Sequence, residues 1–294
     1  MNTIDQGNRF AVRDEQGFDV YMLGNALVEV AVVPELGARI ISLKNLRSGR
    51  EWMWHPPGGL KLFRNQLGDD FSRSPLVGMD ECLPTIAPCS WQGRDLPDHG
   101  EVWSVPWDVD EAAWEAGVLK ASANLEISPL KFERTIELRD NEVQLSYRLN
   151  NLGAEDELYL WAMHPLLRFQ EGDQLQLPPC ARSRLAGGSW LETVSSAVAE
   201  GECAKVFVRP IQVGSAGVYN RGTSDQLEFV WNPAENDTLG LWLTRGGWHG
   251  HHHLALEPTN GAHDALALAA ESGRCGIVDA GGSMTWDIRL RVGP

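Results

Sequence analysis

The alternation of apolar and polar residues along most of the chain is the sequence feature that most constrains its fold. It is clearest in two runs, 132–138 and 143–149, which are separated by the polar segment Arg139-Asp140-Asn141-Glu142. Successive side chains of a strand point to opposite faces, so a run of this period predicts a strand that buries one face. The two runs and the polar segment between them therefore predict a β-hairpin.

The same period recurs from the beginning of the chain to its end. Well over a dozen segments show it, including 27–33, 39–43, 158–163, 227–231, 239–243 and 286–292. Helical periodicity is scarce, and its best instance is 264–272, with Asp264 as the expected N-cap and Gly273 after the last turn. Many strands joined by tight turns predict an all-β fold of two packed antiparallel sheets, with at most one or two short helices.

The chain shows no sign of a domain boundary. No segment rich in Gly, Ser or Pro, no internal repeat and no block of like charges interrupts its 294 residues. All-β sandwiches of this length commonly form one domain, and the length is ample for a sizeable core. We therefore expect residues 1–294 to form a single β-sandwich domain.

The charge of the chain excludes two classes of partner. Its 25 Lys and Arg against 40 Asp and Glu give a formal net charge of -15. Such a chain repels the phosphates of nucleic acid and the surface of an anionic membrane. The first seven residues resemble no signal peptide, and no stretch reaches the roughly 18 apolar residues of a membrane helix. We expect a cytoplasmic protein, either a monomer or a homodimer.

The five cysteines favour free thiols over disulfides. They form an odd and scattered set without a C-x-x-C pair, namely Cys82, Cys89, Cys180, Cys203 and Cys275. The seven-residue spacing of Cys82 and Cys89 fits no zinc motif. We expect all five to be unpaired.

The twelve tryptophans divide into two groups by their surroundings. Apolar strand patterns contain one group, which we expect in the core: Trp52, Trp54, Trp161 and Trp286. Polar turns and histidines flank the other, which is available to stack on a sugar ring or to pack under loops: Trp91, Trp103, Trp107 and Trp248.

Four short segments place ionisable groups beside Gly or Pro, a context typical of rigid functional loops. They are Asp98-His99-Gly100-Glu101, Met163-His164-Pro165, Leu256-Glu257-Pro258-Thr259-Asn260-Gly261 and Gly78-Met79-Asp80-Glu81-Cys82-Leu83-Pro84-Thr85. Taken singly, such a histidine is commonly structural and such a glutamate is commonly a turn residue. Together, two histidines and one glutamate on an all-β chain of this size indicate an acid–base site, a metal site or no site at all.

The order of these segments resembles the galactose mutarotase-like superfamily. The resemblance runs through 34–40, Trp52 to Trp54, 78–84, Asp98-His99-Gly100, His164-Pro165, Leu256-Glu257-Pro258 and the last strand with Trp286. It covers nearly the whole chain. The resemblance implies a large antiparallel β-supersandwich and the activity of an aldose 1-epimerase, which interconverts the α and β anomers of a sugar.

The resemblance also implies roles for three residues. His164 is the expected general acid at the ring oxygen, Glu257 the general base at the anomeric hydroxyl, and His99 a hydroxyl ligand that also assists protonation. Opening a hemiacetal requires one proton to leave O1 and another to reach O5, which an imidazole and a carboxylate of raised pKa are suited to exchange. This chemistry requires neither a metal nor an organic cofactor.

Six further residues are predicted to bind the substrate. Arginines near the loops, Arg39 and Arg73, with Arg64 as a third instance, are the cations that a hexose 6-phosphate would need. At a net charge of -15 we favour a neutral sugar and regard hexose-6-phosphate 1-epimerase as an alternative. The other four predicted ligands are Asp80, Glu81, Trp248 and His251.

The run His249-Gly250-His251-His252-His253 contains residues that often bind metals. In a strand, His251 and His253 share a face and His252 points away. Because no third ligand is evident, we predict no metal and place Trp248 or His251 at the sugar site, since one face of this strand leads to Glu257.

Two other classes of function remain open at this stage. A sugar-binding protein without turnover would use the same sandwich and the same tryptophans. A glycosidase or lyase would need a pair of facing carboxylates or a Tyr/Arg/His arrangement around an open groove. Asp80 and Glu81 are adjacent and point to opposite faces of a strand, so they make a poor facing pair. An epimerase needs His164 and Glu257 on opposite sides of one pocket.

Overall fold

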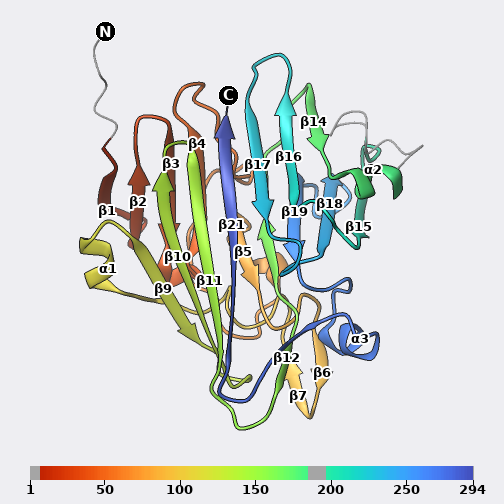
Figure 1. Cartoon of the computed structure of the whole chain (residues 1–294). Helices are drawn as coiled ribbons and strands as arrows, with labels where there is room; N and C mark the ends of the chain where they lie inside the picture. Colours follow the sequence, from red (N-terminus) through yellow and green to blue (C-terminus); the bar gives the residue numbers. More distant parts are fainter. Residues whose placement is uncertain (1–6, 185–196, 294) are drawn as a thin grey trace.

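Two large antiparallel sheets dominate the fold (Figure 1). The structure is a computed structural model, which describes residues 7–184 and 197–293. The nine-stranded sheet has the spatial order β1 (Arg9–Glu15), β2 (Phe18–Gly24), β3 (Val28–Val33), β4 (Arg39–Asn45), β5 (Met79–Cys82), β13 (Ala162–Pro165), β19 (His252–Thr259), β18 (Thr238–Arg245) and β15 (Cys203–Val208). The eight-stranded sheet has the order β14 (Asp173–Gln176), β16 (Ser215–Asn220), β17 (Gln226–Trp231), β21 (Ser283–Gly293), β11 (Glu142–Asn151), β10 (Leu130–Arg139), β9 (Leu119–Asn124) and β8 (Asp108–Val109).

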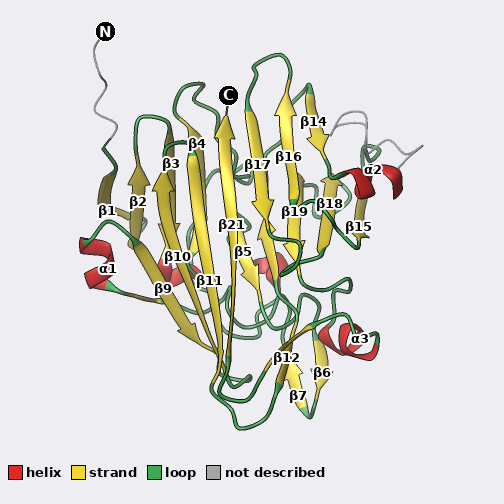
Figure 2. Cartoon of the chain, viewed as in Figure 1, coloured by secondary structure: helices red, strands yellow, loops and turns green. Residues whose placement is uncertain are grey.

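Small elements complete the described part of the chain. Two strand pairs stand apart from the large sheets: β6 (Cys89–Trp91) with β7 (Arg94–Leu96), and β12 (Glu157–Tyr159) with β20 (Gly276–Val278). The α-helices are α1 (Glu111–Glu115), α2 (Pro179–Arg184) and α3 (Leu266–Glu271), and 3₁₀ turns cover Pro34–Leu36 and Phe71–Arg73. Figure 2 shows how little of the chain is helical. The expectation of at most two helices missed α1 and α2, which are only five and six residues long.

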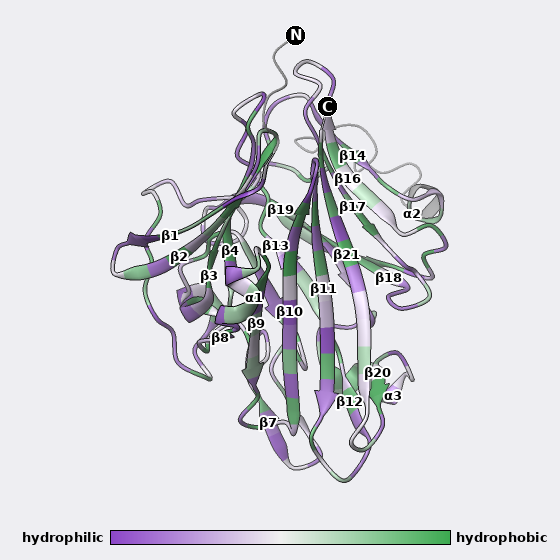
Figure 3. Ribbon diagram, turned by 60° about the vertical axis from the view of Figure 1, so that its left-hand side comes forward, coloured by the Kyte–Doolittle hydropathy of each residue, from purple (hydrophilic) through white to green (hydrophobic). Residues whose placement is uncertain are grey.

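The predicted hairpin is confirmed as β10 and β11, which pair from Leu130 opposite Asn151 to Arg139 opposite Glu142. Every second residue of β10 is buried from Leu130 to Leu138, and Figure 3 shows hydrophobic and hydrophilic residues alternating along this strand. Asp140 in the turn has φ of 53°, the left-handed conformation that Asp tolerates better than most residues. The period of two therefore identified both the strands and their buried face.

One large apolar cluster fills the space between the sheets. It draws residues from both, such as Val30 and Leu256 from the nine-stranded sheet and Leu145 and Leu290 from the eight-stranded sheet. The tryptophans predicted for the core, Trp52, Trp54, Trp161 and Trp286, are all buried. All five cysteines are free, as predicted. Within the described ranges, no helix is long and apolar enough to cross a membrane.

Two predicted elements were wrong in detail. The single run 158–163 is divided between β12 and β13, because the backbone N–H groups of Leu160 and Trp161 donate to Pro84 O and Asn260 Oδ1 at the crossing between two sheets. The predicted helix 264–272 is shorter, and α3 begins after Ala265 without a side-chain cap. Asp264 does not cap it, because its carboxylate forms an ion pair with Lys205 instead.

Candidate active site

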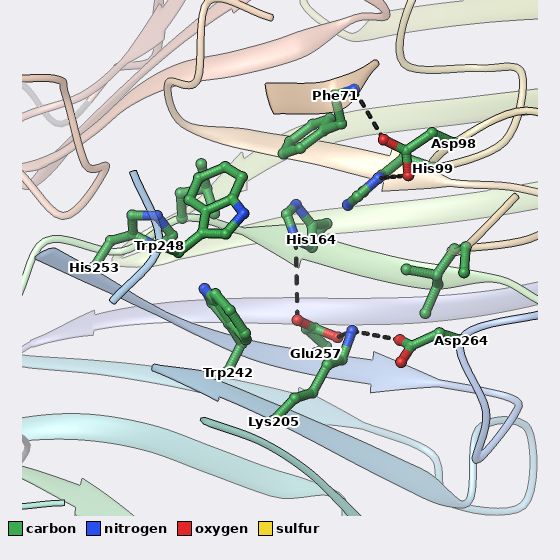
Figure 4. A pocket seen from close by; sticks show the side chains of 13 residues that line it. Phe71, Asp98, His99, His164, Lys205, Trp242, Trp248, His253, Glu257 and Asp264 are labelled. Atoms are coloured by element: carbon green, nitrogen blue, oxygen red, sulfur yellow. Dashed lines mark hydrogen bonds and ion pairs between the residues drawn. The ribbon is translucent and has the colours of Figure 1, made fainter. Parts of the chain in front are cut away.

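A cavity of about 220 Å³ lies on the face of the nine-stranded sheet that is turned away from the eight-stranded sheet. Leu254 and Leu256 of β19 belong to the core between the sheets, so His253 and Glu257 point to the opposite face. The walls of the cavity come from strands β13, β15, β18 and β19 and from loops around residues 71, 86, 98, 248 and 264. The side chains that line it are Phe71, Ile86, Ala87, Asp98, His99, His164, Leu166, Lys205, Trp242, Trp248, His253, Glu257 and Asp264 (Figure 4).

The register of three strands brings His164 and Glu257 together. Strand β13 lies between β5 and β19, and Ala162 pairs with Thr259. His164 and Glu257 each lie two residues from this pair, so they are neighbours across β13 and β19. His164 Nε2 lies 4.0 Å from Glu257 Oε1. The chain thus places the two residues predicted to be acid and base at one cavity, although they are far apart in sequence.

Gly240 leaves the space that the Glu257 side chain occupies. The two residues are paired across β18 and β19. A Cβ atom at position 240 would lie 2.7 Å from Glu257 Oε2 and 3.1 Å from Glu257 Cβ, which is closer than atoms normally approach. The absence of a side chain here lets the carboxylate lie against the sheet.

Lys205 of β15 joins two carboxylates in the wall of the cavity. Its Nζ lies 3.2 Å from Glu257 Oε2 and 2.7 Å from Asp264 Oδ1. Burial acts to lower the pKa of Lys205, but the negative charges of Glu257 and Asp264 outweigh it, and the net effect is a raised pKa. Lys205 is therefore a cation at neutral pH, placed between two carboxylates.

His164 is buried among groups that disfavour a positive charge. Burial lowers the pKa of His164 well below its usual value, and electrostatic interactions with His99 and Lys205 lower it further. Its Nδ1 has no hydrogen-bond partner among the described residues. His164 is consequently neutral in the unliganded protein near pH 7.

His99 has a carboxylate partner of its own. Its Nδ1 lies 2.9 Å from Asp98 Oδ1. Burial acts to raise the pKa of Asp98, but the hydrogen bond and charge of His99 outweigh it, and the net effect is a lowered pKa. The rings of His99 and His164 pack edge to face with centroids 5.0 Å apart.

Aromatic rings form the remaining wall. Trp242 and Trp248 line the cavity with His253, whose two ring nitrogens have no hydrogen-bond partner among the described residues. Burial lowers the pKa of His253 to about 3, so its ring is neutral. His251 packs beside it, both rings lying 4.9 Å from that of Trp54, whereas the exposed His252 bonds Glu200 on the other side. His251 and His253 therefore lie on one face of the strand and His252 on the other, as predicted.

Five of the six predicted sugar ligands, including His251, lie outside the lining of the cavity. Arg39 and Asp80 form a fully buried ion pair of 2.7 Å, and burial raises the pKa of Asp80 to about 6 against the attraction of Arg39. Glu81 points between the sheets, where it accepts hydrogen bonds from Arg134, Tyr147 and Trp161. Arg73 is exposed. Asp80 and Glu81 therefore take opposite faces of β5, and each is buried with an arginine partner.

Several lining residues were not predicted from the sequence. Lys205, Asp264 and Trp242 were missed as site residues, because no local motif marks them and only the pairing of β15 with β18 brings Lys205 opposite Trp242. Of the four tryptophans proposed for stacking, Trp248 alone lines the cavity. Trp103 and Trp107 are buried in the interior, and Trp91 packs on a small cluster near α3. His251 lies beside the cavity rather than in its lining.

The described residues contain no group of three or more His, Cys, Asp or Glu side chains arranged to hold a metal ion. The histidines at 249–253 interact with tryptophans and Glu200 instead. The ionisable side chains that line the cavity are the carboxylates of Asp98, Glu257 and Asp264, the imidazoles of His99, His164 and His253, and the amine of Lys205.

Solved structures with the same fold are numerous, whereas no protein-family model and no curated protein matches the sequence. A protein of Synechocystis sp. PCC 6803 is 18% identical, with a TM-score of 0.69 over 100% of this chain and 98% of the other. A Klebsiella pneumoniae protein provisionally named an aldose 1-epimerase is 14% identical, with a TM-score of 0.74 over 98% and 84%. A galactose mutarotase-like protein of Clostridium acetobutylicum is 12% identical, with a TM-score of 0.73 over 97% and 98%. The chain thus has the galactose mutarotase-like fold, as predicted.

Proposed function

We propose that this protein is an aldose 1-epimerase that interconverts the α and β anomers of a neutral sugar. The observation that carries the proposal is the meeting of Glu257 with two imidazoles, His164 and His99, at one cavity. At about 220 Å³, the cavity is smaller than the roughly 300–1,000 Å³ that holds a drug-sized ligand and suits a monosaccharide. The fold is shared with a protein provisionally named an aldose 1-epimerase and with one named galactose mutarotase-like, which supports the proposal.

The proposed reaction needs two proton transfers in each direction. Glu257 takes the proton of the anomeric hydroxyl while an imidazole gives a proton to the ring oxygen. The bond between C1 and the ring oxygen breaks and leaves an open-chain aldehyde. Rotation about the C1–C2 bond presents the other face of the aldehyde, and the reverse transfers close the ring. Both groups return to their starting states, so no cofactor enters the balance.

The other walls provide contacts suited to a sugar. The indoles of Trp242 and Trp248 offer faces for the C–H groups of a pyranose ring. His253 is neutral and has two free ring nitrogens, so it can donate one hydrogen bond to a hydroxyl and accept another. Asp264, held by Lys205, offers a further acceptor near Glu257.

The charges favour a neutral sugar over a sugar phosphate. Lys205 is the one lysine or arginine among the described residues that line the cavity, and two carboxylates already neutralise it. A dianionic phosphate placed here would face Asp98, Glu257 and Asp264 without a free cation. We expect hexose 6-phosphates to be poor substrates.

Anomer exchange is the direct test. Freshly dissolved α-glucose, α-galactose and a panel of other aldoses are followed by polarimetry or one-dimensional exchange NMR with and without the protein. The expected result is faster exchange for at least one neutral sugar, reduced by roughly 10²–10⁴-fold in Glu257→Gln, which keeps the size and polarity of the side chain. Glu271→Gln on α3, an exposed position, is the matched control and should exchange at the wild-type rate.

A sugar-binding protein without turnover is the second candidate. The wall of Trp242, Trp248 and His253 favours it, because these contacts would hold a sugar whether or not Glu257 acts as a base. Binding of a sugar by calorimetry, together with no acceleration of exchange across the whole panel, would select this candidate and reject the epimerase.

A further inference from the structure

The loop that carries His99 fixes its imidazole from several sides. Asp98 Oδ1 lies 2.9 Å from His99 Nδ1, and Asp98 Oδ2 accepts the backbone N–H of Phe71 at 2.9 Å. The ring of Phe71 stacks on that of His99 with centroids 3.9 Å apart. Because a carboxylate with two such donors can only accept, Nδ1 of His99 carries a proton and Nε2 remains for the cavity.

The backbone at His99 is held in a conformation that few residues adopt. His99 has φ of 57°, and its N–H donates to Ile86 O at 2.6 Å. At the next residue, Gly100, a Cβ atom would lie 2.0 Å from Leu83 O, so only glycine fits. A left-handed residue other than glycine is strained and persists where its surroundings enforce it, often at functional sites. The dyad of Asp98 and His99 is thus built into the loop.

His164 has neither a carboxylate bound to its ring nor a left-handed backbone conformation. No described carboxylate hydrogen-bonds its ring, and Glu257 is 4.0 Å from its Nε2. Burial and nearby positive charges lower the pKa of His164. In Figure 4 His164 lies between His99 on one side and Glu257 on the other. The position of His164 in the lining of the cavity suits a neutral group that forms hydrogen bonds with the sugar.

We infer that the proton delivered to the ring oxygen comes from Nε2 of His99, that Asp98 is the positioning residue for this proton donor, and that His164 remains neutral. This inference rests on the proposed function and reassigns the acid within it. In ring opening, Nε2–H of His99 protonates the ring oxygen as C1–O5 breaks, while Glu257 takes the proton of O1. In ring closure, the O5 hydroxyl returns its proton to Nε2 as it attacks C1, and Glu257 returns its proton to O1.

Asp98 supports the charged form of His99 that this reaction needs. With Nδ1–H bound to Asp98, Nε2 can donate a proton only when the ring is an imidazolium. Besides Asp98, the titratable groups that interact with His99 are Asp80 of β5 and His164 of β13, and Asp70, which interacts with Asp98 and Arg73, lies at the 3₁₀ turn of Phe71. The carboxylates of Asp98 and Asp80 both interact electrostatically with His99.

The test compares pH–rate profiles of anomer exchange for the full chain and three variants. The alkaline limb of the profile is the pH range in which the rate falls as the pH rises. In Asp98→Asn, this limb is expected to move to lower pH, because an imidazolium without its carboxylate partner gives up its proton more readily. In His99→Asn, the rate should fall by roughly 10²–10⁴-fold and the alkaline limb should vanish. In His164→Asn, the rate falls but the limb stays in place. Asp95→Asn, an exposed carboxylate three residues from Asp98, is the matched control and should leave the profile unchanged.

Other outcomes overturn the inference. A uniform loss of rate in Asp98→Asn at every pH would mean that Asp98 is only structural. Loss of the alkaline limb in His164→Asn, with its retention in His99→Asn, would make His164 the acid. Restoration of exchange in His99→Ala by added imidazole supports the inference, and the same rescue in His164→Ala alone opposes it. No exchange with the wild-type protein would reject the proposed function itself, an outcome distinct from all of these. Circular dichroism verifies that each variant is folded.

Discussion

At the scale of single residues, the candidate site depends on one position that carries no side chain. Gly240 faces Glu257 across β18 and β19, and the space that its missing Cβ leaves is taken by the Glu257 carboxylate. Lys205 holds that carboxylate from the other side. The position of the proposed base is therefore set by residues that take no part in the proton transfer.

Replacing Gly240 by alanine tests this arrangement. A Cβ atom 2.7 Å from Glu257 Oε2 forces the carboxylate away from the ring-opening position. We expect kcat for anomer exchange to fall by roughly 10²-fold, since misplacement of a catalytic group by about 1 Å can cost that much. Gly58→Ala, where nothing lies within 4 Å of the added atom, is the control. If Gly240→Ala exchanged anomers at the wild-type rate, the Glu257 side chain would have to reach its working position in spite of the added Cβ atom.

What the sequence predicts about the site is limited to residues with a local motif. His99, His164 and Glu257 each stand beside Gly or Pro in a segment resembling a known family, and all three line the cavity. Lys205 and Trp242 lie in ordinary alternating strands, and only the register of β15 and β18 places them at the cavity. Asp80 and Glu81 were misleading, because polar residues in a proline-rich segment look like loop ligands whether they face a cavity or the core.

At the scale of elements, a polar cluster ties the two sheets together. Glu81 of β5 accepts from Arg134 of β10 at 2.9 Å and from Tyr147 of β11 at 2.9 Å, and both ion-pair partners are almost fully buried. Arg134 also donates to Ala38 O. Burial raises the pKa of Glu81, but Arg134 and the hydrogen bonds oppose that rise. Removing one partner of such a buried ion pair strongly destabilises a protein, because the other charge is left buried and unpaired.

Two arginines of the same strand allow a comparison between buried and exposed ion pairs. Arg134→Met leaves Glu81 without its cation and is expected to lower the free energy of unfolding by about 3–5 kcal/mol. Arg139→Met removes the exposed pair with Glu137, also 2.9 Å long, and should cost no more than about 1 kcal/mol. Urea unfolding measures both. Equal losses in the two variants would contradict a special role for the interior pair.

Prediction of the elements succeeded where hydrophobic period alone decides the structure. Strands β3, β4, β10, β11, β17, β18 and β21 were all found within a few residues of their ends. The run 158–163 was read as one strand, since its apolar residues give no sign that the chain changes sheets at Leu160. Helices of five or six residues, such as α1, are too short for a helical period to emerge.

At the scale of the whole molecule, the buried histidine His253 couples stability to pH. Its pKa is about 3 in the fold, against about 6.5 for an unperturbed histidine. Between these values the unfolded chain binds a proton that the folded protein does not, so the free energy of unfolding falls as pH falls. The slope is up to about 1.4 kcal/mol per pH unit. Asp80, with a raised pKa of about 6, acts in the opposite sense.

A variant isolates the contribution of His253 from these opposing effects. His253→Phe should lose less stability than the wild type between pH 7 and pH 5, by about 1–2 kcal/mol in urea unfolding. His252→Phe, whose ring is exposed, is the control and should follow the wild type closely. Parallel curves for the wild type and His253→Phe would refute the coupling.

We also propose that the described chain unfolds as one domain. The largest apolar cluster takes residues from both sheets, from Tyr21 near the beginning to Val292 near the end. Unfolding followed by tryptophan fluorescence and by far-ultraviolet circular dichroism should therefore give coincident transitions. Two separate transitions would indicate that the sheets form independent units.

The place of β21 in the eight-stranded sheet bears on how the protein is made. This last strand of the chain lies between β17 and β11, and Arg291 bonds a residue 149 positions earlier. While the ribosome is still adding residues 283–293, β11 and β17 lack their shared neighbour and expose unpaired backbone edges. Nascent chains in that state are prone to aggregate. Synthesis must therefore deliver this segment before the sheet can close, and chaperones that shield open sheet edges would aid the yield of this protein.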